Sequence, residues 1–128
     1  MSALVLDSGG VTRLARRNAG SLAAIRAFRR EGLWPPVVPT MVLVESVTGR
    51  QRRDANVERF LKTCEIVEPV PEGIARRAAS LRTQARQGSA VDALVIAMAE
   101  PGGDVLSGDL ADLRALAMHA VDVTVHRA

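Results

Sequence analysis

The sequence predicts a three-layer α/β/α fold, in which a mostly parallel sheet of four to five strands is flanked by helices. Short apolar runs alternate along the chain with stretches of helical spacing, and this alternation is typical of a parallel sheet covered on both faces. The chain has 128 residues, of which 48% are hydrophobic, so it can build one sizeable core. It contains no internal repeat or long linker, and we therefore assign residues 1–128 to a single domain.

The N-terminal part of the chain predicts two short strands and a helix between them. The apolar run 3–6 is typical of a buried strand. Residues 21–30 have helical spacing, with Ser21 as the N-cap and Gly32 as the stop. Prolines on both sides confine residues 37–38 to a short extended piece.

The remaining chain continues the alternation of helices and strands. Thr40 is well placed to cap a helix that ends at Gly49, where a polar loop with several arginines begins. The later patterns predict, in order, a helix near 56–63, a strand over 65–67, helices over 71–87 and 90–100, a strand over 104–106, a helix over 110–117 and a strand over 121–125.

The basic residues are almost all arginine. The chain has 17 basic and 14 acidic residues, yet its pI is near 10.4. The pI is this high because Lys62 is the only lysine and the other basic residues are arginines, which stay protonated. This excess fits either a GC-rich genome or a phosphate-bearing partner. An acid-free patch that suits phosphates contains Arg13, Arg16, Arg17, Arg26, Arg29 and Arg30. Aromatic residues make up only 2% of the chain, which argues against a base-stacking surface.

Several protein classes are excluded by what the sequence lacks. No apolar stretch is long enough to span a membrane, and the N-terminus has no basic lead-in of a signal peptide. The single cysteine, Cys64, cannot form an internal disulfide, and a zinc site needs more Cys or His than the chain offers. We therefore expect a cytoplasmic protein.

Four acidic residues stand in unusual surroundings. Asp7 and Asp109 each follow a predicted strand, and Glu45 and Asp92 are the only charges in the apolar segments MVLVESV and VDALVIAMA. Because a helix that is apolar on every face is usually buried, we expect Glu45 and Asp92 to enter low-dielectric surroundings. An ionised carboxylate there is costly unless it is paired or bound to a metal.

Each of these acids also has a purely structural explanation. Asp7 and Asp109 could cap the helices that follow them, and Asp92 could favour the first turn of its own helix. Glu45 lies beyond the reach of a cap, so its structural alternative is a buried ion pair with an arginine.

The fold brings three of the acids to one place if strands 3–6 and 104–106 are neighbours. Sites in open α/β sheets form outside the carboxyl ends of the strands, where Asp7, Asp92 and Asp109 would then meet. Two carboxylates about 4 Å apart repel by about 4 kcal/mol at an effective dielectric of about 20, so the cluster needs a counter-charge. Oxygen ligands favour Mg²⁺ or Mn²⁺ over zinc, and such an ion can activate a water for phosphodiester hydrolysis.

The order of these motifs resembles the PIN-domain family and, within it, the VapC-type toxins of bacterial toxin–antitoxin pairs. The resemblance covers essentially the whole chain and rests on LVLDS at Asp7, VLVES at Glu45, SAVDALVIAMAE at Asp92 and VLSGDLADL at Asp109. It implies an endoribonuclease that depends on Mg²⁺ or Mn²⁺. It also implies an RNA substrate, a cognate antitoxin protein as partner, and a homodimer.

The resemblance also implies roles for individual residues. Asp7, Glu45, Asp92 and Asp109 match the acidic quartet, with Asp7, Asp92 and Asp109 as metal ligands and Glu45 completing the pocket or orienting the attacking water. The supporting positions around the site are Ser8, Ser107 and Asp112, of which the last could equally be an ordinary first-turn residue. The arginines that would guide the RNA backbone are Arg13, Arg16, Arg17, Arg50, Arg52 and Arg53.

The sequence departs from the toxin pattern at one place. After the first aspartate the toxins commonly have Ser/Thr-Ser-Ala, whereas here Gly9 and Gly10 let the chain turn into a helical stretch.

Two alternative functions remain open. The first is a catalytically silent PIN-like module that binds RNA or a protein. The second is a different Mg²⁺-dependent α/β protein, such as a phosphotransfer receiver or an aspartyl phosphatase. The chain lacks the late lysine of a receiver and the acid at position 9 of a phosphatase.

Overall fold

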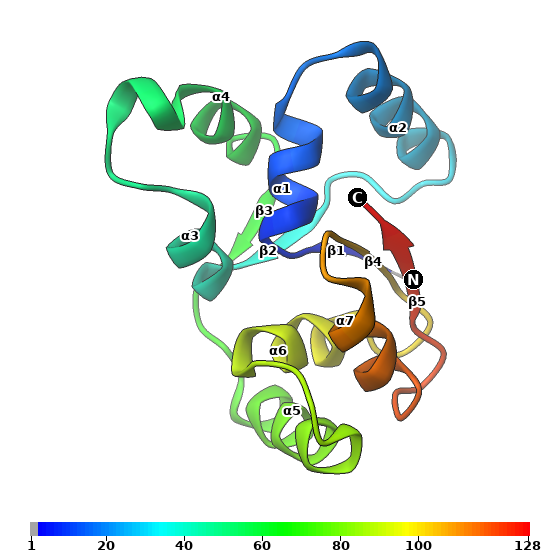
Figure 1. Ribbon diagram of the computed structural model, residues 1–128. Coiled ribbons are helices and arrows are strands. Elements are labelled where there is room, and N and C mark those ends of the chain that lie inside the picture. The colour runs from blue at the N-terminus through cyan, green and yellow to red at the C-terminus, as the bar shows by residue number, and fades with distance from the viewer. Residues whose placement is uncertain (1–2) are drawn as a thin grey trace.

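The computed structural model describes residues 3–128, which form five strands and seven helices (Figure 1). All five strands are parallel, in the spatial order β3-β2-β1-β4-β5. The predicted α/β fold with a parallel sheet is confirmed. The strands are β1 (Leu4–Leu6), β2 (Val37–Pro39), β3 (Glu65–Val67), β4 (Asp104–Ser107) and β5 (Thr124–Arg127).

Helices cover both faces of the sheet and so produce the three layers. In Figure 1, α1, α2 and α4 lie above the sheet, and α5, α6 and α7 lie below it. None of the helices described in residues 3–128 has the length and hydropathy needed to cross a bilayer. Their bounds are α1 (Ser8–Ala15), α2 (Ala19–Arg30), α3 (Thr40–Ser46), α4 (Gln51–Leu61), α5 (Glu72–Ala85), α6 (Ala90–Ala99) and α7 (Leu110–Ala117).

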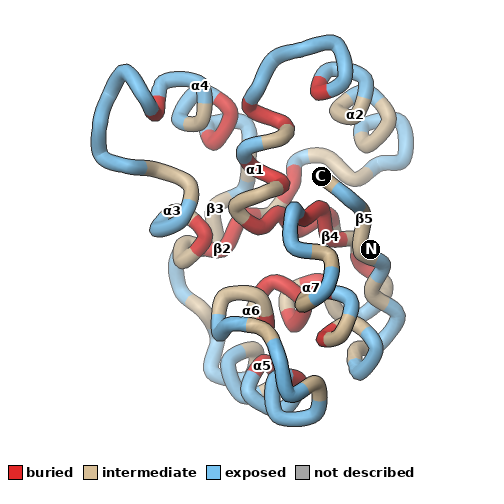
Figure 2. Tube along the Cα trace, viewed as in Figure 1, coloured by how far each residue is buried: buried red, intermediate tan, exposed pale blue. Residues whose placement is uncertain are grey.

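The centre of the sheet is the most deeply buried part of the molecule (Figure 2). Every side chain of β1 is fully buried, and so is Val105 at the centre of β4. On the lower face, α6 packs on both strands and buries Val95 and Ile96. Strands covered on both faces are apolar throughout, which is why such short segments could be recognised in the sequence.

The pairing of β1 with β4 places a switch in the winding of the chain at the middle of the sheet. The register sets Leu6 beside Leu106. After β1 the chain enters α1 on one face, and after β4 it enters α7 on the other (Figure 1). Ligand sites of open α/β sheets form at such a point. The condition for the acids to converge, that strands 3–6 and 104–106 be neighbours, is therefore met.

Two predicted helix caps are wrong. The N-cap of α2 is Asn18, whose side chain accepts a hydrogen bond from the backbone N–H of Ser21 at 2.8 Å. Ser21 itself is buried, and its hydroxyl donates to the carbonyl oxygen of Arg13 at 2.6 Å. Thr40 is the first residue of α3 and donates to the carbonyl oxygen of Val67 at 3.2 Å. Both hydroxyls make tertiary contacts, which local sequence spacing does not reveal.

The arginines predicted to lie in a loop are mostly helical. The helix α3 ends before the predicted stop at Gly49, and α4 begins early enough to include Arg52 and Arg53. The connection is held by buried Asp54, which accepts hydrogen bonds from the backbone N–H groups of Thr48 at 2.9 Å and Gly49 at 2.8 Å. Burial alone would raise the pKa of Asp54, but these hydrogen bonds outweigh it and hold the pKa below its ordinary value.

The last strand begins later than predicted, at Thr124. The residues before it are held by other contacts, because the backbone N–H of Val121 donates to the carboxylate of Glu100 at 2.7 Å and Asp122 has a left-handed backbone with φ of 56°. Glu100 also forms a bidentate pair with Arg77, at 2.7 and 2.8 Å, and this pair lowers the pKa of Glu100. The predicted strand residues 121–123 therefore form a connection instead.

Gly9 and Gly10 lie inside the first turn of α1 rather than in a turn that precedes it. The helix approaches the end of β4 so closely that a Cβ on Gly10 would lie 2.5 Å from the carbonyl oxygen of Leu106. A Cβ on Gly9 would overlap the backbone nitrogen of Gly108. The glycines lower helix propensity but permit this contact between backbones, which positions the start of α1 at the switch point.

Gly10→Ala is expected to lower the free energy of unfolding by about 1–3 kcal/mol, because the added methyl group forces the backbones of α1 and β4 apart. Gly73→Ala in α5 is the matched control. Nothing lies within 4 Å of the Cβ it would add, so better helix propensity should raise stability by about 0.5 kcal/mol. Urea unfolding of both variants measures the difference. Equal effects of the two substitutions would contradict the close approach.

Candidate metal centre

Asp7 joins the buried centre of the sheet to the start of α1. It directly follows β1 and is only 5% exposed. One carboxylate oxygen accepts a hydrogen bond from the backbone N–H of Gly10 at 2.9 Å, and the other accepts one from the hydroxyl of Ser107. Burial raises the pKa of Asp7 and the charge of Asp92 adds to this effect, while the two hydrogen bonds only partly offset it.

Ser107 ties the ends of the two central strands together. Because Leu6 pairs with Leu106, Ser107 comes next to Asp7 across the strands. Its buried hydroxyl donates to Asp7 and accepts a hydrogen bond from the backbone N–H of Asp109 at 2.8 Å. A single hydroxyl thus sets the Asp7 carboxylate and the turn before α7 relative to each other.

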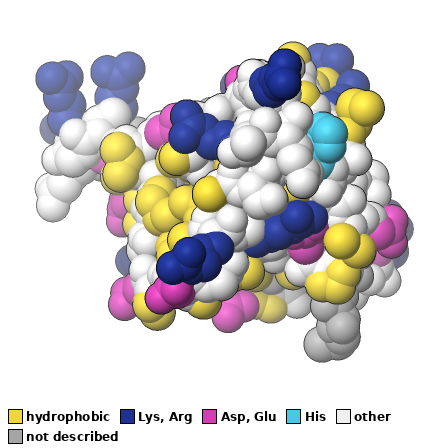
Figure 3. Space-filling view, turned by 90° about the horizontal axis from the view of Figure 1, so that it is seen from below, with side chains coloured by type: hydrophobic (Ala, Val, Ile, Leu, Met, Phe, Trp, Pro, Cys, Tyr) yellow, Lys and Arg dark blue, Asp and Glu magenta, His cyan; other side chains and the backbone are white. Residues whose placement is uncertain are grey.

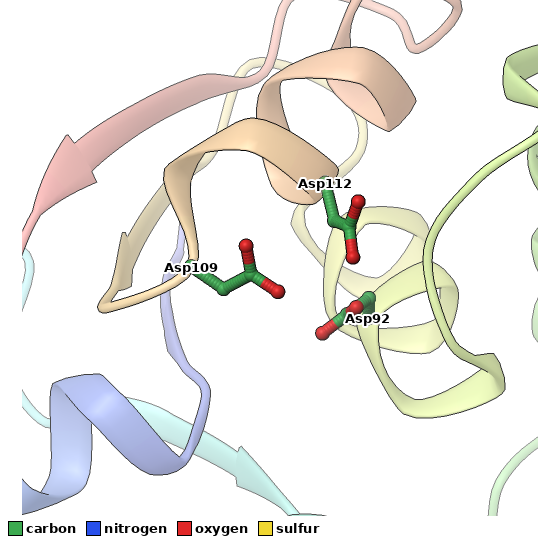
Figure 4. Close-up of side chains that lie close together, drawn as sticks. All are labelled: Asp92, Asp109 and Asp112. Carbon is green, nitrogen blue, oxygen red and sulfur yellow. The ribbon is translucent and has the colours of Figure 1, made fainter.

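Three carboxylates converge beside this contact (Figure 4). Asp92 comes from the first turn of α6, Asp109 precedes α7, and Asp112 lies in the first turn of α7. Each offers an oxygen, and these oxygens lie within 4.8 Å of one another. Asp109 is exposed, yet the desolvation that it does undergo raises its pKa, and the charges of Asp112 and Asp92 raise it further. The cluster therefore concentrates negative charge at the switch point.

Helix capping, the structural alternative to metal binding, explains some of these acids. Asp7 is the N-cap of α1, and Asp92 forms a capping box with Ser89, in which each side chain accepts from the other residue's backbone N–H at 3.0 Å. Asp109 occupies the N-cap position of α7, but its side chain makes no capping hydrogen bond. Capping therefore accounts for Asp7 and for one oxygen of Asp92, and leaves the position of Asp109 unexplained.

The donor set fits a hard divalent cation. Among residues 3–128, no arginine or lysine forms an ion pair with the clustered acids, so the charge is not neutralised by a guanidinium. Carboxylate oxygens without nitrogen or sulfur ligands suit Mg²⁺ or Mn²⁺. The residues that would hold such an ion are Asp92, Asp109 and Asp112, with Asp7 linked to them through Ser107.

Glu45 does not lie in the buried surroundings that its sequence context predicts. In α3 only Val42 is buried, whereas Val44 is 81% exposed and Glu45 is exposed as well. The helix is short, and apolar residues on its outer side find no layer to pack against. Among the described residues Glu45 forms no ion pair, so the predicted structural alternative is wrong too. It lines an open hollow of about 300 Å³ together with Ser8.

The predicted RNA-binding arginines lie in three places. Arg13 and Arg16 line the same hollow as Glu45 and Ser8, next to the candidate site. Arg17 lines a different and mostly apolar hollow between α1, α2 and α4. The arginines exposed at the start of α4 are Arg50, Arg52 and Arg53.

Gln87 is a polar residue at the site that sequence reasoning missed. It lies between α5 and α6, and its side-chain amide donates to the carboxylate of Asp112 at 2.9 Å. The same nitrogen lies 3.5 Å from the carbonyl oxygen of Ala111. Gln87 belongs to no recognisable motif and is distant from Asp112 in the sequence, so only the three-dimensional structure brings out this contact.

No family model and no curated protein matches the sequence, but solved structures match the fold. VapBC2 from Rickettsia felis, bound to a DNA fragment from its promoter, superposes with a TM-score of 0.70 over 98% of both chains, at 12% identity. FitAcB from Neisseria gonorrhoeae superposes with a TM-score of 0.63 over 95% of both chains, at 16% identity. Both are toxin–antitoxin complexes that contain a PIN-domain toxin.

The chain has a PIN-like fold. The resemblance inferred from the four acidic motifs is thereby confirmed at the level of the fold. Near-full coverage of both chains shows that the PIN-like unit accounts for the sheet and for helices on both of its faces. At identities this low the match carries the fold alone, and the chemistry rests on the residues of this chain.

Asp7→Asn is expected to raise the free energy of unfolding of the metal-free PIN-like domain at neutral pH. A raised carboxyl pKa means that the folded chain binds the proton more tightly than the unfolded chain, so ionised Asp7 opposes folding above that pKa. This gain in the free energy of unfolding should disappear as the pH falls below the ordinary pKa of aspartate. Asparagine keeps an acceptor for the Gly10 N–H but places its amide N–H₂ against Ser107, and the loss of the acceptor of the Ser107 hydroxyl offsets part of this gain. Denaturant unfolding in EDTA, from acidic to neutral pH, measures both stabilities, and a variant less stable at neutral pH would contradict the assignment.

Proposed function

We propose that this protein is a metal-dependent endoribonuclease that acts as the toxin of a toxin–antitoxin pair. The observation that carries the proposal is the convergence of Asp92, Asp109 and Asp112 beside the Asp7–Ser107 contact, at the switch point of a PIN-like fold. The cofactor would be Mg²⁺ or Mn²⁺ and the substrate RNA. The lone cysteine, Cys64, supports a cytoplasmic location.

Some of the acidic side chains would bind the cation, and others keep their neighbours in position. When bound, the cation would activate a water molecule and neutralise charge on the scissile phosphate. Asp92 and Asp109 would bind it, with Asp112 as the third carboxylate of the cluster. Asp7, kept in place by Ser107, adjoins them and adds negative charge.

The hollow beside the cluster would receive the RNA strand. It is lined by Arg13 and Arg16, whose guanidinium groups attract phosphates, and by the hydroxyl-bearing Ser8. Glu45 lines the same hollow and would orient the attacking water rather than bind the cation. The exposed arginines of α4, Arg52 and Arg53, would add long-range attraction for the polyanion.

Asp92→Asn and Asp109→Asn are each expected to lower RNA cleavage by about 100-fold or more, because each removes a negative oxygen ligand from the cluster. The control is Asp122→Asn, the same substitution at an exposed residue outside the cluster. Its left-handed backbone suits asparagine. Cleavage of single-stranded RNA with Mg²⁺ or Mn²⁺ is the assay, and EDTA should abolish cleavage by the wild type.

Calorimetry with Mn²⁺ separates the nuclease from the alternative of a silent binding module. The wild type and Asp122→Asn should bind the ion, and Asp92→Asn should bind it weakly or not at all. A protein that binds RNA equally well with and without EDTA and never cuts it would support the silent module. Equal cleavage by wild type and Asp92→Asn would sink the nuclease assignment.

The proposed partners are a small antitoxin protein and a second copy of the chain. Several large apolar side chains are exposed, among them Val44, Met118 and Val121. Figure 3 shows further hydrophobic patches on the side of α5 and α6, interspersed with charged side chains. The likeness to two toxin–antitoxin complexes supports the first partner. Apolar surface of this kind is also consistent with a homodimer.

Expression of the chain alone is expected to arrest bacterial growth, and co-expression with the protein encoded beside it should restore growth and yield a complex that co-purifies. Asp92→Asn should be tolerated without the partner and should still bind it, because the substitution removes only a ligand oxygen. Growth and co-purification are the two measurements. Tolerance of the wild type at high levels, together with no co-purifying partner, would contradict the toxin proposal.

A further inference from the structure

A second hollow, at the α5 side of the molecule, shares no lining residue with the hollow of Arg13 and Arg16. It is open, with a volume of about 390 Å³, and is formed by the last turn of α5 and the connection to α6. Neither the resemblance nor the acidic motifs assign a role to it. Its lining residues are Ala79, Arg82, Thr83, Arg86, Gln87 and Gly88.

The hollow is positively charged and the charge is unpaired. Two guanidinium groups, those of Arg82 and Arg86, line it, and among the described residues no carboxylate does. None of the ion pairs within residues 3–128 involves either arginine. The Nε of Arg82 donates to the carbonyl oxygen of Gly88 at 3.1 Å, which orients the guanidinium group. Its terminal nitrogens have no hydrogen-bond partner in the described part of the chain, so they are available to an anion.

Gln87 connects this hollow to the acidic cluster. The residue lines the hollow, and its amide donates to the carboxylate of Asp112 at 2.9 Å. The Gln87 side chain is therefore in contact with both the basic hollow and one of the three carboxylates. The turn that produces this arrangement is tight, since Arg86 ends α5 with a left-handed backbone at φ of 58° and Gly88 follows at φ of 93°.

An RNA strand that passes over the acidic cluster needs positive charge on both sides of it. A cation held by the three carboxylates can neutralise the scissile phosphate, but neighbouring phosphates meet the remaining negative charge of the acids. They are bound only where basic side chains flank the cluster. Arg13 and Arg16 supply that charge on the α1 side, and Arg82 and Arg86 supply it on the α5 side.

We propose that the hollow formed by Arg82, Thr83 and Arg86 is a subsite for a backbone phosphate of single-stranded RNA, next to the scissile phosphate. The proposal rests on the proposed nuclease function for its location relative to the metal. The binding itself is independent of catalysis. The two guanidinium groups match the oxygens of a phosphodiester, while the Thr83 hydroxyl already donates to the carbonyl oxygen of Ala79 at 3.0 Å. The absence of aromatic side chains in the lining means that the subsite binds the backbone and does not stack on a base.

The test is the salt dependence of RNA binding in EDTA, where no cleavage occurs. Arg82→Gln and Arg86→Gln are each compared with Arg76→Gln, which removes the same charge from the first turns of the same helix. Arg76 is paired with Glu72 at 2.7 Å and does not line the hollow. A short labelled single-stranded RNA is titrated at several salt concentrations. Each hollow variant should weaken binding several-fold at low salt and reduce the slope of log K against log salt by about 0.7, the value for one lost phosphate contact on a single strand.

Further measurements separate this proposal from its alternatives. With Mn²⁺ present, the hollow variants should raise KM for RNA cleavage with little change in kcat, because the lost contact is made equally in the ground and transition states. Inorganic phosphate, titrated by calorimetry, should bind far more weakly than RNA. Saturable phosphate binding as tight as RNA binding would mean a site for a free anion and would overturn the proposal.

The outcomes also distinguish the subsite from the nuclease function. If the wild type cleaves RNA but Arg82→Gln and Arg86→Gln keep the wild-type salt slope, the subsite is wrong and the nuclease stands. If the slopes fall as expected but no preparation cleaves RNA, the nuclease is wrong and the hollow still binds RNA. An equal loss of slope in Arg76→Gln would show a non-specific charge effect. Thermal unfolding of each variant verifies that it is folded.

Discussion

The parallel pairing of β1 with β4 is the constraint on which the candidate site depends. It sets Asp7 beside Ser107, although a hundred positions separate them in the sequence. The Ser107 hydroxyl then donates to one aspartate and accepts from the backbone N–H of the other, Asp109. Because Ser107 is fully buried and water does not reach it, the loss of either partner would leave a polar group unsatisfied. The Asp7–Ser107 contact is therefore part of the buried sheet, while the clustered carboxylates Asp92, Asp109 and Asp112 lie nearer the surface.

Most of the fold could be predicted from the sequence because the central strands β1 and β4 are buried on both faces. The run LVL of β1 and the pair Val105-Leu106 inside β4 are apolar enough to be recognised locally, and β3 begins and ends as predicted. The errors lie where tertiary contacts decide the local structure. Ser21 and Thr40 have the chemistry of caps, yet their hydroxyls bond to distant carbonyl oxygens. The last strand is delayed because Glu100 holds the backbone of Val121.

The site was predictable to the extent that each acid follows a strand or begins a helix. Asp92 and Asp109 meet as expected and Asp112 joins them, whereas Asp7, also expected as a ligand, is not one of the three carboxylates that lie within 4.8 Å of one another. Glu45 differs, since a short apolar helix at the end of a sheet has fewer neighbours than its hydrophobicity suggests, and its outer side faces solvent. Gln87 and the arginines near it could not have been found, because their significance comes only from proximity to a residue far along the chain.

The carboxylates of the site come from two separate parts of the chain, with β1 at one end and the segment from α6 to α7 at the other. A break in the connection between β3 and α5 would leave Asp7 on one fragment and Asp92, Asp109 and Asp112 on the other. The second fragment would keep the three clustered carboxylates but lack Asp7 and its hydrogen bond with Ser107, and each fragment would expose a bare edge of the central strands. Recovery of the site would thus require reassociation, which makes this domain a natural candidate for fragment complementation.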